Sequence, residues 1–416
     1  MTEKTDTLSP AAQILQDLIR CPSVTPLEGG ALDVMQSRLK ALGFTVKRKV
    51  FSSPDTPDVE NLYARLGDQS PNLCFAGHTD VVPVGDPTAW TSDPFQASIL
   101  DGMMIGRGAV DMKGGIACFL AAVEAHLNDA KPLRGSLSFL ITGDEEGPAV
   151  NGTKAILEWL VDQGEQIDAC VVGEPTNPET IGDAIKIGRR GSISGTIEIT
   201  GIQGHSAYPH LADNPARGIV ALTRALLAEP FDQGTKVFQP TNLEVTSIDI
   251  GNPAFNVIPH TASARFNIRF NDTWTADTIC REIECRLDRA AHDDELRKPV
   301  DGQPRPPVNY TVNYGQRPSH VFLTNDKKLI AALSQAVTTI TGKSPELSTG
   351  GGTSDARFIK DVCPVVEFGL VGQTMHQIDE RVALDDLEKL TAIYGQFIEG
   401  FFSEDADTPR SSSGEY

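Results

Sequence analysis

Acidic and histidine side chains follow several apolar segments that have the character of buried strands. His78 and Asp80 form an HxD pair at the end of the apolar run that begins at Asn72. Residues i and i+2 of a strand share a face, so the carboxylate of Asp80 can orient the imidazole of His78. Taken alone, such a pair is more often a satisfied polar pair at a strand end than part of a metal site.

Three further carboxylates occupy comparable positions. Glu145 and Glu146 follow the apolar segment 136–142 in the sequence TGDEEG, and Glu174 follows the apolar segment 169–172. Open α/β sheets bind their ligands at the carboxyl ends of the strands. Each acid would be unremarkable as a solvated turn residue, but adjacent buried carboxylates repel one another unless a cation lies between them. The cluster therefore indicates a metal site.

Two more residues complete a set of metal ligands. Asp111 lies in GRGAVDMKGG before a predicted helix, where capping the helix is the alternative role, and His376 follows the apolar segment 365–369. Two imidazoles and three carboxylates suit Zn²⁺, with Co²⁺ or Mn²⁺ as substitutes. If Asp111 bridges two ions, each ion holds one histidine, one terminal carboxylate and the shared aspartate, and the site stays electrophilic. The ligand set is His78, Asp111, Glu146, Glu174 and His376.

Other chemistries and partners are poorly supported. The chain has no P-loop and no HExxH motif, the GxG at residue 106 lacks a third glycine, and Ile193 occupies the centre of GSISG, where a nucleophile elbow needs serine. A net charge of −20 disfavours nucleic acid and anionic membranes as partners. Seven scattered cysteines without a CxxC pair, and no apolar run of roughly 18 residues, predict a cytoplasmic protein with reduced thiols.

The chain is long enough for two domains, because its 416 residues exceed the roughly 250–300 at which a single core usually stops growing. Residues 1–187 alternate predicted strands and helices, which indicates an α/β/α domain with a central twisted sheet. The predicted helices cover 10–20, 31–42, 114–127 and 153–163, and the predicted strands cover 44–51, 61–66, 72–76, 136–142 and 169–172.

The order of elements changes at Gly188. Predicted strands 192–200, 244–250, 262–270 and 308–314 and predicted helices 215–227 and 276–290 follow the order βαββαβ. This order predicts an inserted α+β domain of the ferredoxin-like kind over 188–317. The first domain resumes over 318–403, with predicted helices 326–341 and 384–402 and a predicted strand at 365–369, and the polar segment 404–416 is expected to be disordered.

Ten segments spread along the chain, its tail excepted, carry a resemblance to a known family. They are LIRCPSVTP, FAGHTDVVPVGD, AWTSDPF, GRGAVDMKGGIA, ITGDEEGPAVNGT, GEPT, IKIGRRGSISG, GHSAYPHLADNP, NVIPHTASARFNIRF and TGGGTSDARFI. The chain resembles the M20 family of metallopeptidases and amidohydrolases. HTD, DMKGG and DEE are shared by the wider family, whereas GRRGSISG, TGGGTSD and AWTSDPF favour the members that act on a succinylated diaminopimelate.

The resemblance assigns roles to particular residues. It implies that Glu145 is the general base, that Asp80 orients His78, and that the ligand set holds two Zn²⁺ per subunit, with Co²⁺ able to occupy one site. It also implies a homodimer formed through the inserted domain, in which His205 of the partner subunit stabilises the developing oxyanion. The positions that match substrate-binding residues are Arg189, Ser192, Asn256, Arg269, Gly352 and Thr353.

By that resemblance, the expected reaction is hydrolysis of N-succinyl-LL-2,6-diaminopimelate to succinate and LL-2,6-diaminopimelate. Arg189 and Arg269 would bind the carboxylates of the substrate in bidentate pairs; their alternative role is that of surface strand arginines. Two other functions stay open. One is a different amide hydrolase of the family, such as an acetylornithine deacetylase or an aminoacylase. The other is a non-catalytic protein with a structural metal, whose mark would be loss of the base, and Glu145 is present.

Overall fold

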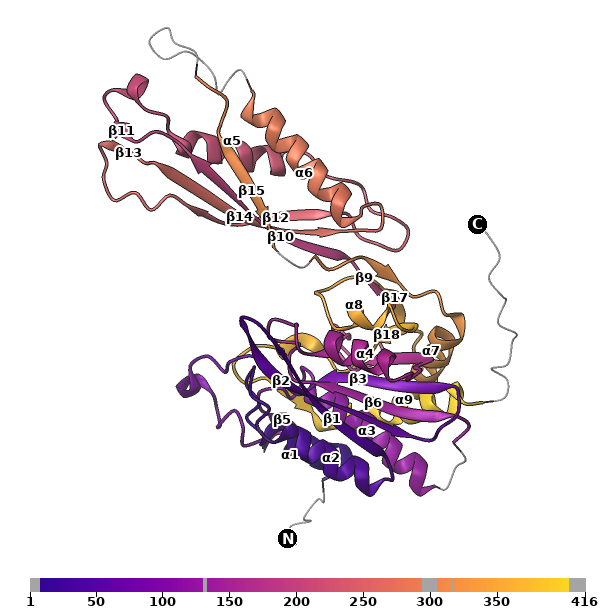
Figure 1. Ribbon diagram of the computed structural model, residues 1–416. Coiled ribbons are helices and arrows are strands. Elements are labelled where there is room, and N and C mark those ends of the chain that lie inside the picture. Colours follow the sequence, from indigo (N-terminus) through magenta and orange to yellow (C-terminus); the bar gives the residue numbers. More distant parts are fainter. Residues whose placement is uncertain (1–7, 130–132, 294–304, 316–317, 404–416) are drawn as a thin grey trace, which may run out of the picture. The chain divides into compact units, whose positions relative to one another are not determined.

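An eight-stranded mixed sheet forms the centre of the first of two units into which the chain divides (Figure 1). The computed structural model describes residues 8–129, 133–293, 305–315 and 318–403. The first unit comprises Met1–Ile187, Thr324–Ser348 and Ser354–Tyr416, and the second comprises Gly188–Leu323 and Thr349–Thr353. The second unit is therefore an insertion in the first.

The strands of this main sheet run in the order β1-β2-β6-β3-β7-β18-β8-β17. Their bounds are β1 Thr45–Ser53, β2 Thr56–Leu66, β3 Asn72–His78, β6 Ser136–Thr142, β7 Ala169–Val172, β8 Ala184–Lys186, β17 Glu346–Ser348 and β18 Val365–Glu367. The central strands β6, β3, β7 and β18 are parallel to one another, so their carboxyl ends meet at one edge of the sheet. Every residue of β3, β6, β7 and β18 is buried, which explains why these segments read as continuous apolar runs.

Helices cover both faces of this sheet, which confirms the predicted α/β/α fold (Figure 1). They are α1 Pro10–Ile19, α2 Ala31–Ala41, α3 Lys113–Asn128, α4 Thr153–Asp162, α7 Lys327–Thr341, α8 Ala356–Ile359 and α9 Leu384–Phe401. Helix α3, most of whose residues are buried, packs against α1 and α9, and the ring of Phe119 on α3 stacks on Phe75 of β3 at 4.5 Å. This packing fixes the helix that begins two residues after Asp111. A small sheet of β4 Ser98–Leu100, β5 Met103–Ile105 and β19 Arg381–Ala383 lies beside the main one in the same unit.

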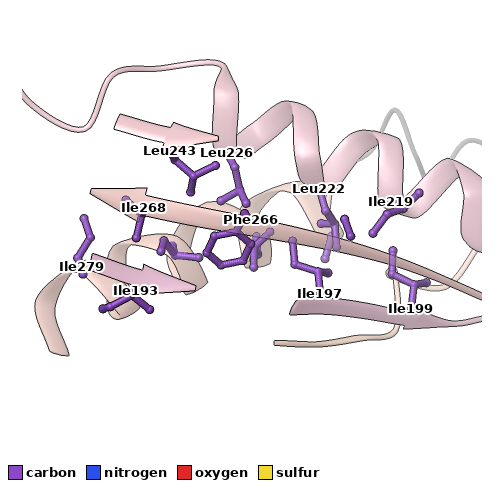
Figure 2. Close-up of a cluster of buried hydrophobic side chains, with 14 of the residues drawn as sticks. Ile193, Ile197, Ile199, Ile219, Leu222, Leu226, Leu243, Phe266, Ile268 and Ile279 are labelled. Carbon is purple, nitrogen blue, oxygen red and sulfur yellow. The ribbon is translucent and has the colours of Figure 1, made fainter. Parts of the chain in front are cut away.

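The second unit is a four-stranded antiparallel sheet in the order β12-β14-β10-β15 with two helices, which is the predicted βαββαβ arrangement. Its main elements are β10 Gly191–Thr200, α5 Pro215–Leu227, β12 Asn242–Asp249, β14 Thr261–Phe270, α6 Ala276–Ala291 and β15 Tyr310–Tyr314. Alternate residues of β10 are buried, and Figure 2 shows Ile197 of β10, Phe266 of β14 and Leu222 of α5 meeting in one apolar cluster. This core belongs to the unit itself.

Short elements at the edges of the units were not predicted. They are β8, β17, the small sheet with β19, the pairs β9 Gly188–Arg189 with β16 Phe322–Leu323 and β11 Gly204–His205 with β13 Val257–Ile258, the helix α8, and the 3₁₀ turns Pro87–Ala89, Pro209–Leu211 and Gly372–Thr374. Segments of two to four residues carry too little periodicity to be recognised. The predicted disorder of 404–416 falls outside the described residues. Within the described part of the chain, no helix is both long enough and apolar enough to cross a membrane.

The boundary between the units differs from the predicted one in two places. The second unit extends to Leu323 rather than 317, because β16 pairs with β9. It also includes Thr349–Thr353, which was expected in the first domain. Two hydrogen bonds hold this segment: Arg189 Nη1 donates to the carbonyl of Gly350 at 3.0 Å, and the Thr349 hydroxyl donates to the carbonyl of Val237 at 2.5 Å.

Candidate metal centre

The parallel strands of the first unit deliver the predicted ligands to one edge of the sheet. His78 is the last residue of β3, Glu145 and Glu146 follow β6, and Glu174 follows β7. Asp111 lies just before α3, and His376 lies in the loop between β18 and β19. Residues that are almost 300 positions apart in the sequence therefore meet at this edge.

Asp111 lies between the two histidines. Its Oδ1 is 3.2 Å from Nε2 of His78, and its Oδ2 is 3.2 Å from Nε2 of His376. The two oxygens of one carboxylate thus face two different imidazoles. This is the arrangement that a carboxylate bridging two metal ions requires.

Each imidazole has a second carboxylate of its own. His78 Nε2 lies 3.8 Å from Oε1 of Glu174, and His376 Nε2 lies 2.8 Å from Oε1 of Glu146. These contacts give two groups of three residues. Each group has one histidine, one terminal carboxylate and the shared Asp111. The structure therefore brings the five predicted ligands together, and an oxygen of Glu146 also lies within 4.8 Å of a ligand atom of His78.

The electrostatics of the cluster suit divalent cations. Burial raises the pKa of Glu174, and the nearby charges of Asp111 and Glu145 raise it further. Burial would also raise the pKa of Asp111, but its hydrogen bonds with His376 and His78 hold that pKa well below the usual range. The protonated imidazoles thus supply the positive charge that the carboxylates need. Imidazole and carboxylate donors are a set that Zn²⁺ binds, so these residues fit a two-metal centre.

Glu145 is half-buried and lies beside the ligands. Its side chain offers an oxygen that lies within 4.8 Å of ligand atoms of His78 and Glu174. Burial raises the pKa of Glu145 well above its ordinary value, and the negative charges of Asp355, Glu146 and Asp111 add to the effect. A carboxylate with a raised pKa is suited to take up and return a proton near neutral pH.

Asp80 contacts His78 differently from the prediction. The Nδ1 atom of His78 lies 2.9 Å from the main-chain carbonyl oxygen of Asp80 and 3.6 Å from its carboxylate. The carboxylate instead accepts hydrogen bonds from the backbone N–H groups of Glu145 at 3.3 Å and Glu146 at 3.0 Å. Asp80 therefore holds the imidazole through its carbonyl and the segment of the two glutamates through its side chain.

The predicted substrate residues all lie in the second unit, where they form two groups. Arg189, Ser192 and Arg269 lie where β10 begins, since Ser192 pairs with Arg269 across β10 and β14, and Gly352 and Thr353 belong to the segment that Arg189 contacts. A side chain on the neighbouring Gly351, whose φ is +99°, would lie 2.5 Å from the guanidinium of Arg189. Glycine at that position lets the segment approach Arg189.

His205 and Asn256 lie in and next to a separate two-stranded sheet, β11 with β13, beyond the other end of β10 (Figure 1). His205 is on β11, which pairs with β13, and the carbonyl of Asn256 accepts a hydrogen bond from Ser206 N at 3.0 Å. Ser192 and Thr200 are eight residues apart on β10, which corresponds to about 26 Å of extended strand. One copy of this unit does not bring the two groups together.

Two buried charged residues near the ligands were not predicted. Arg107 and Glu380 form an ion pair with a distance of 2.8 Å between Nη1 and Oε2, and Glu380 also accepts hydrogen bonds from the backbone next to Asp111. Glu380 stands four residues after His376, in a loop whose sequence has no periodicity. Neither residue carried a sequence signal, because charged loop residues are usually solvated.

Metal binding to this cluster should release protons. Hydrogen bonds with Asp111 and Glu146 raise the pKa of His376 to about 10, so at pH 7 its imidazole is charged in the metal-free protein. A metal ion binds only the neutral imidazole, so the proton must leave. We expect at least one proton per chain to appear when zinc is titrated calorimetrically in two buffers of different ionisation enthalpy. A binding heat that is the same in both buffers would contradict this assignment.

Comparison with known proteins gives one family match and several solved structures of the same fold. Residues 74–400 match the model of peptidase family M20/M25/M40. Among solved structures, an M20 family metallo-carboxypeptidase from Sulfolobus solfataricus is 17% identical, with a TM-score of 0.74 over 95% of this chain and 100% of that one. A tripeptidase from Staphylococcus aureus is 18% identical, with a TM-score of 0.72 over 94% and 98% of the two chains. A dinuclear metal-binding M20 peptidase from Bacillus subtilis is 16% identical, with a TM-score of 0.60 over 94% and 96%.

Proposed function

This chain belongs to peptidase family M20/M25/M40, a family of metal-dependent hydrolases, and we propose that it is a two-zinc amide hydrolase acting on N-succinyl-LL-2,6-diaminopimelate. The products are succinate and LL-2,6-diaminopimelate, which places the proposed reaction in the synthesis of lysine and diaminopimelate. The family supports metal-dependent hydrolysis, and the choice of this substrate is supported by the motifs GRRGSISG, TGGGTSD and AWTSDPF.

The position of Asp111 between the two histidines is the observation that carries the proposal. Its two oxygens lie at 3.2 Å from His78 and 3.2 Å from His376, and each imidazole has its own terminal glutamate. A structural zinc site is usually closed by four protein ligands, whereas each group here offers three. The ligand count therefore supports two catalytic metal sites more than a structural one.

The chemistry of the reaction divides between the metals and Glu145. When bound, the two ions supply the Lewis acid that polarises the amide carbonyl and lowers the pKa of the attacking water. Glu145 takes one proton from that water as the new C–O bond forms, and it returns the proton to the nitrogen as the C–N bond breaks. The carboxylate oxygen thus gains and then loses one proton, and the electron pair of the broken bond leaves with the amine.

The second unit supplies recognition in this proposal. Arg189 and Arg269 bind carboxylates of the substrate, which allows a chain with a net charge of −20 to accept an anionic substrate. His205 of the partner subunit donates a hydrogen bond to the developing oxyanion. The wide separation between His205 and the arginines along β10 supports a site completed by two copies of the chain.

The test compares hydrolysis of a succinylated amine with hydrolysis of an acetylated amine by the same protein. Loss of one charge-assisted contact costs about 1.5–3 kcal/mol, so we expect kcat/KM of the zinc-loaded protein to be about 10–100-fold higher for N-succinyl-LL-2,6-diaminopimelate than for N-acetylornithine. Arg269→Gln should remove most of this preference. Initial rates with both substrates measure it.

Arg265→Gln is the matched control, because Arg265 is on the same strand and its side chain is exposed beside Asp249. It should keep the preference of the natural chain. Hydrolysis of N-acetylornithine alone would instead identify another amide hydrolase of the family. Two bound metal ions without hydrolysis of either amide would support a binding protein.

A further inference from the structure

Glu380 is a fully buried carboxylate that binds the backbone of the segment carrying Asp111. Its Oε1 accepts hydrogen bonds from the N–H groups of Val110 at 2.9 Å and Asp111 at 3.1 Å. Its Oε2 accepts from the N–H of Gly108 at 3.1 Å and from Arg107 Nη1 at 2.8 Å. Four donors therefore converge on one carboxylate, and three of them are backbone groups within the four residues that end at Asp111.

Arg107 extends this contact to two other loops. Its guanidinium, also buried, donates to the carbonyl of Gln377 at 3.2 Å and to the carbonyl of Pro83 at 3.4 Å, and it lies 5.2 Å from the ring centre of Trp90. Gln377 follows His376 directly, and Pro83 is in the loop that follows His78. The Arg107–Glu380 pair thus joins the three loops that carry His78, Asp111 and His376.

The loop between His376 and Glu380 has a strained backbone. His376 has a φ of 62° and Asp379 a φ of 57°, in the left-handed region that residues other than glycine seldom adopt. Such conformations persist where surrounding contacts determine them. Here Asp379 accepts hydrogen bonds from the N–H of Thr91 at 2.8 Å and from its hydroxyl at 2.7 Å, and Glu380 provides the other anchor.

The contact repeats a pattern on the other side of the centre. Asp80, two residues after His78, accepts from the N–H groups of Glu145 at 3.3 Å and Glu146 at 3.0 Å. Each histidine loop therefore carries a carboxylate that holds the backbone of an acidic segment of the site. In the case of Glu380, Arg107 balances the charge, so the contact adds no net negative charge beside the ligands.

We propose that Glu380 is a positioning residue of the metal centre, which fixes the backbone of Asp111 relative to His376 so that the shared carboxylate faces both histidines. The inference rests on the metal centre of the proposed function and is independent of the substrate. Groups that orient metal ligands typically change metal affinity or activity by about 10–100-fold when they are replaced.

The test replaces Glu380 by glutamine, which keeps the shape but leaves one acceptor oxygen for four donors. We expect zinc affinity to fall by about 10–100-fold. In the metal-free variant, amide hydrogen exchange of Gly108, Val110 and Asp111 should accelerate by about tenfold or more, while exchange in β6 is unchanged. Mass spectrometry of peptides covering 106–112 measures the amide exchange. Competition with a chelator measures the zinc affinity.

Glu165→Gln is the matched control, because Glu165 pairs with Arg65 and accepts from the Tyr63 hydroxyl at 3.1 Å at the other edge of the sheet. It should keep the zinc affinity and the exchange rates of the natural chain. A loss of stability in Glu380→Gln as large as that in the control does not bear on the proposal. The proposal is overturned if Glu380→Gln binds zinc like the natural chain and its amide exchange over 106–112 is unchanged.

The natural chain provides a second measurement should Glu380→Gln not fold. Its metal-free form must already protect the amides of Val110 and Asp111, and exchange as fast as that of an unstructured peptide would overturn the proposal. Neither readout requires hydrolysis. Failure of the succinylated substrate would therefore count against the proposed function and leave the role of Glu380 to be decided by affinity and exchange.

Discussion

Glu145→Gln should lower kcat by about 10²–10⁴-fold while the protein still binds two zinc ions, because a positioned general base contributes a factor of that size. The glutamine fills the same space but cannot accept the proton of the attacking water. Burial and the neighbouring carboxylates raise the pKa of Glu145, so in the natural chain the group can both take and return a proton near neutral pH.

Metal content separates this role from ligation. An oxygen of Glu145 lies within 4.8 Å of ligand atoms of His78 and Glu174, close enough for Glu145 to be a ligand instead. Zinc content of the purified variant, determined together with kcat, decides between the two. A variant that loses one zinc per chain along with its activity would show that Glu145 binds metal.

Asp111→Asn should weaken both metal sites at once and lower kcat/KM by at least about 10³-fold. Metal ions contribute several kcal/mol to such reactions, and each 1.36 kcal/mol corresponds to a factor of ten in rate. Asparagine replaces one oxygen by an NH₂ group, which cannot bind a metal ion, and it removes the negative charge that both histidines contact at 3.2 Å.

Variants of the terminal glutamates are the controls for this prediction. Glu146 forms an ion pair with His376, and Glu174 forms one with His78. Glu146→Gln and Glu174→Gln should therefore each weaken one site and spare the other. Zinc titration of the metal-free variants measures this, and an Asp111→Asn variant that loses only one of two sites would exclude the bridging role.

Much of the site was predictable because its ligands follow long, buried strands. The apolar runs that end near His78, Glu145 and Glu174 are parallel neighbours in the sheet, and parallel strands place their carboxyl ends together. The grouping of one histidine and one glutamate around Asp111 followed from counting charges. The second unit was predictable for a similar reason, since β10 and β14 alternate buried and exposed residues over ten positions each.

The contacts that hold the ligands in place were predictable only in part. Asp80 was expected to orient His78 through its carboxylate, which lies 3.6 Å from Nδ1 of the ring. The carbonyl oxygen of Asp80 is closer, at 2.9 Å, and the carboxylate also accepts hydrogen bonds from the backbone of Glu145 and Glu146. Besides contacting each other, Glu380 binds backbone N–H groups and Arg107 binds backbone carbonyl groups, and all residue types except proline offer both groups. The pattern of side chains in the sequence therefore does not predict contacts to the backbone.

The most direct test of the central claim is a zinc titration of the metal-free chain in which bound metal and hydrolysis of N-succinyl-LL-2,6-diaminopimelate are followed in the same sample. We expect two zinc ions per chain at saturation, with turnover that is absent without metal and maximal when both sites are filled. Binding of a single ion per chain, or full turnover in a chain stripped of metal, would contradict the two-metal centre around Asp111.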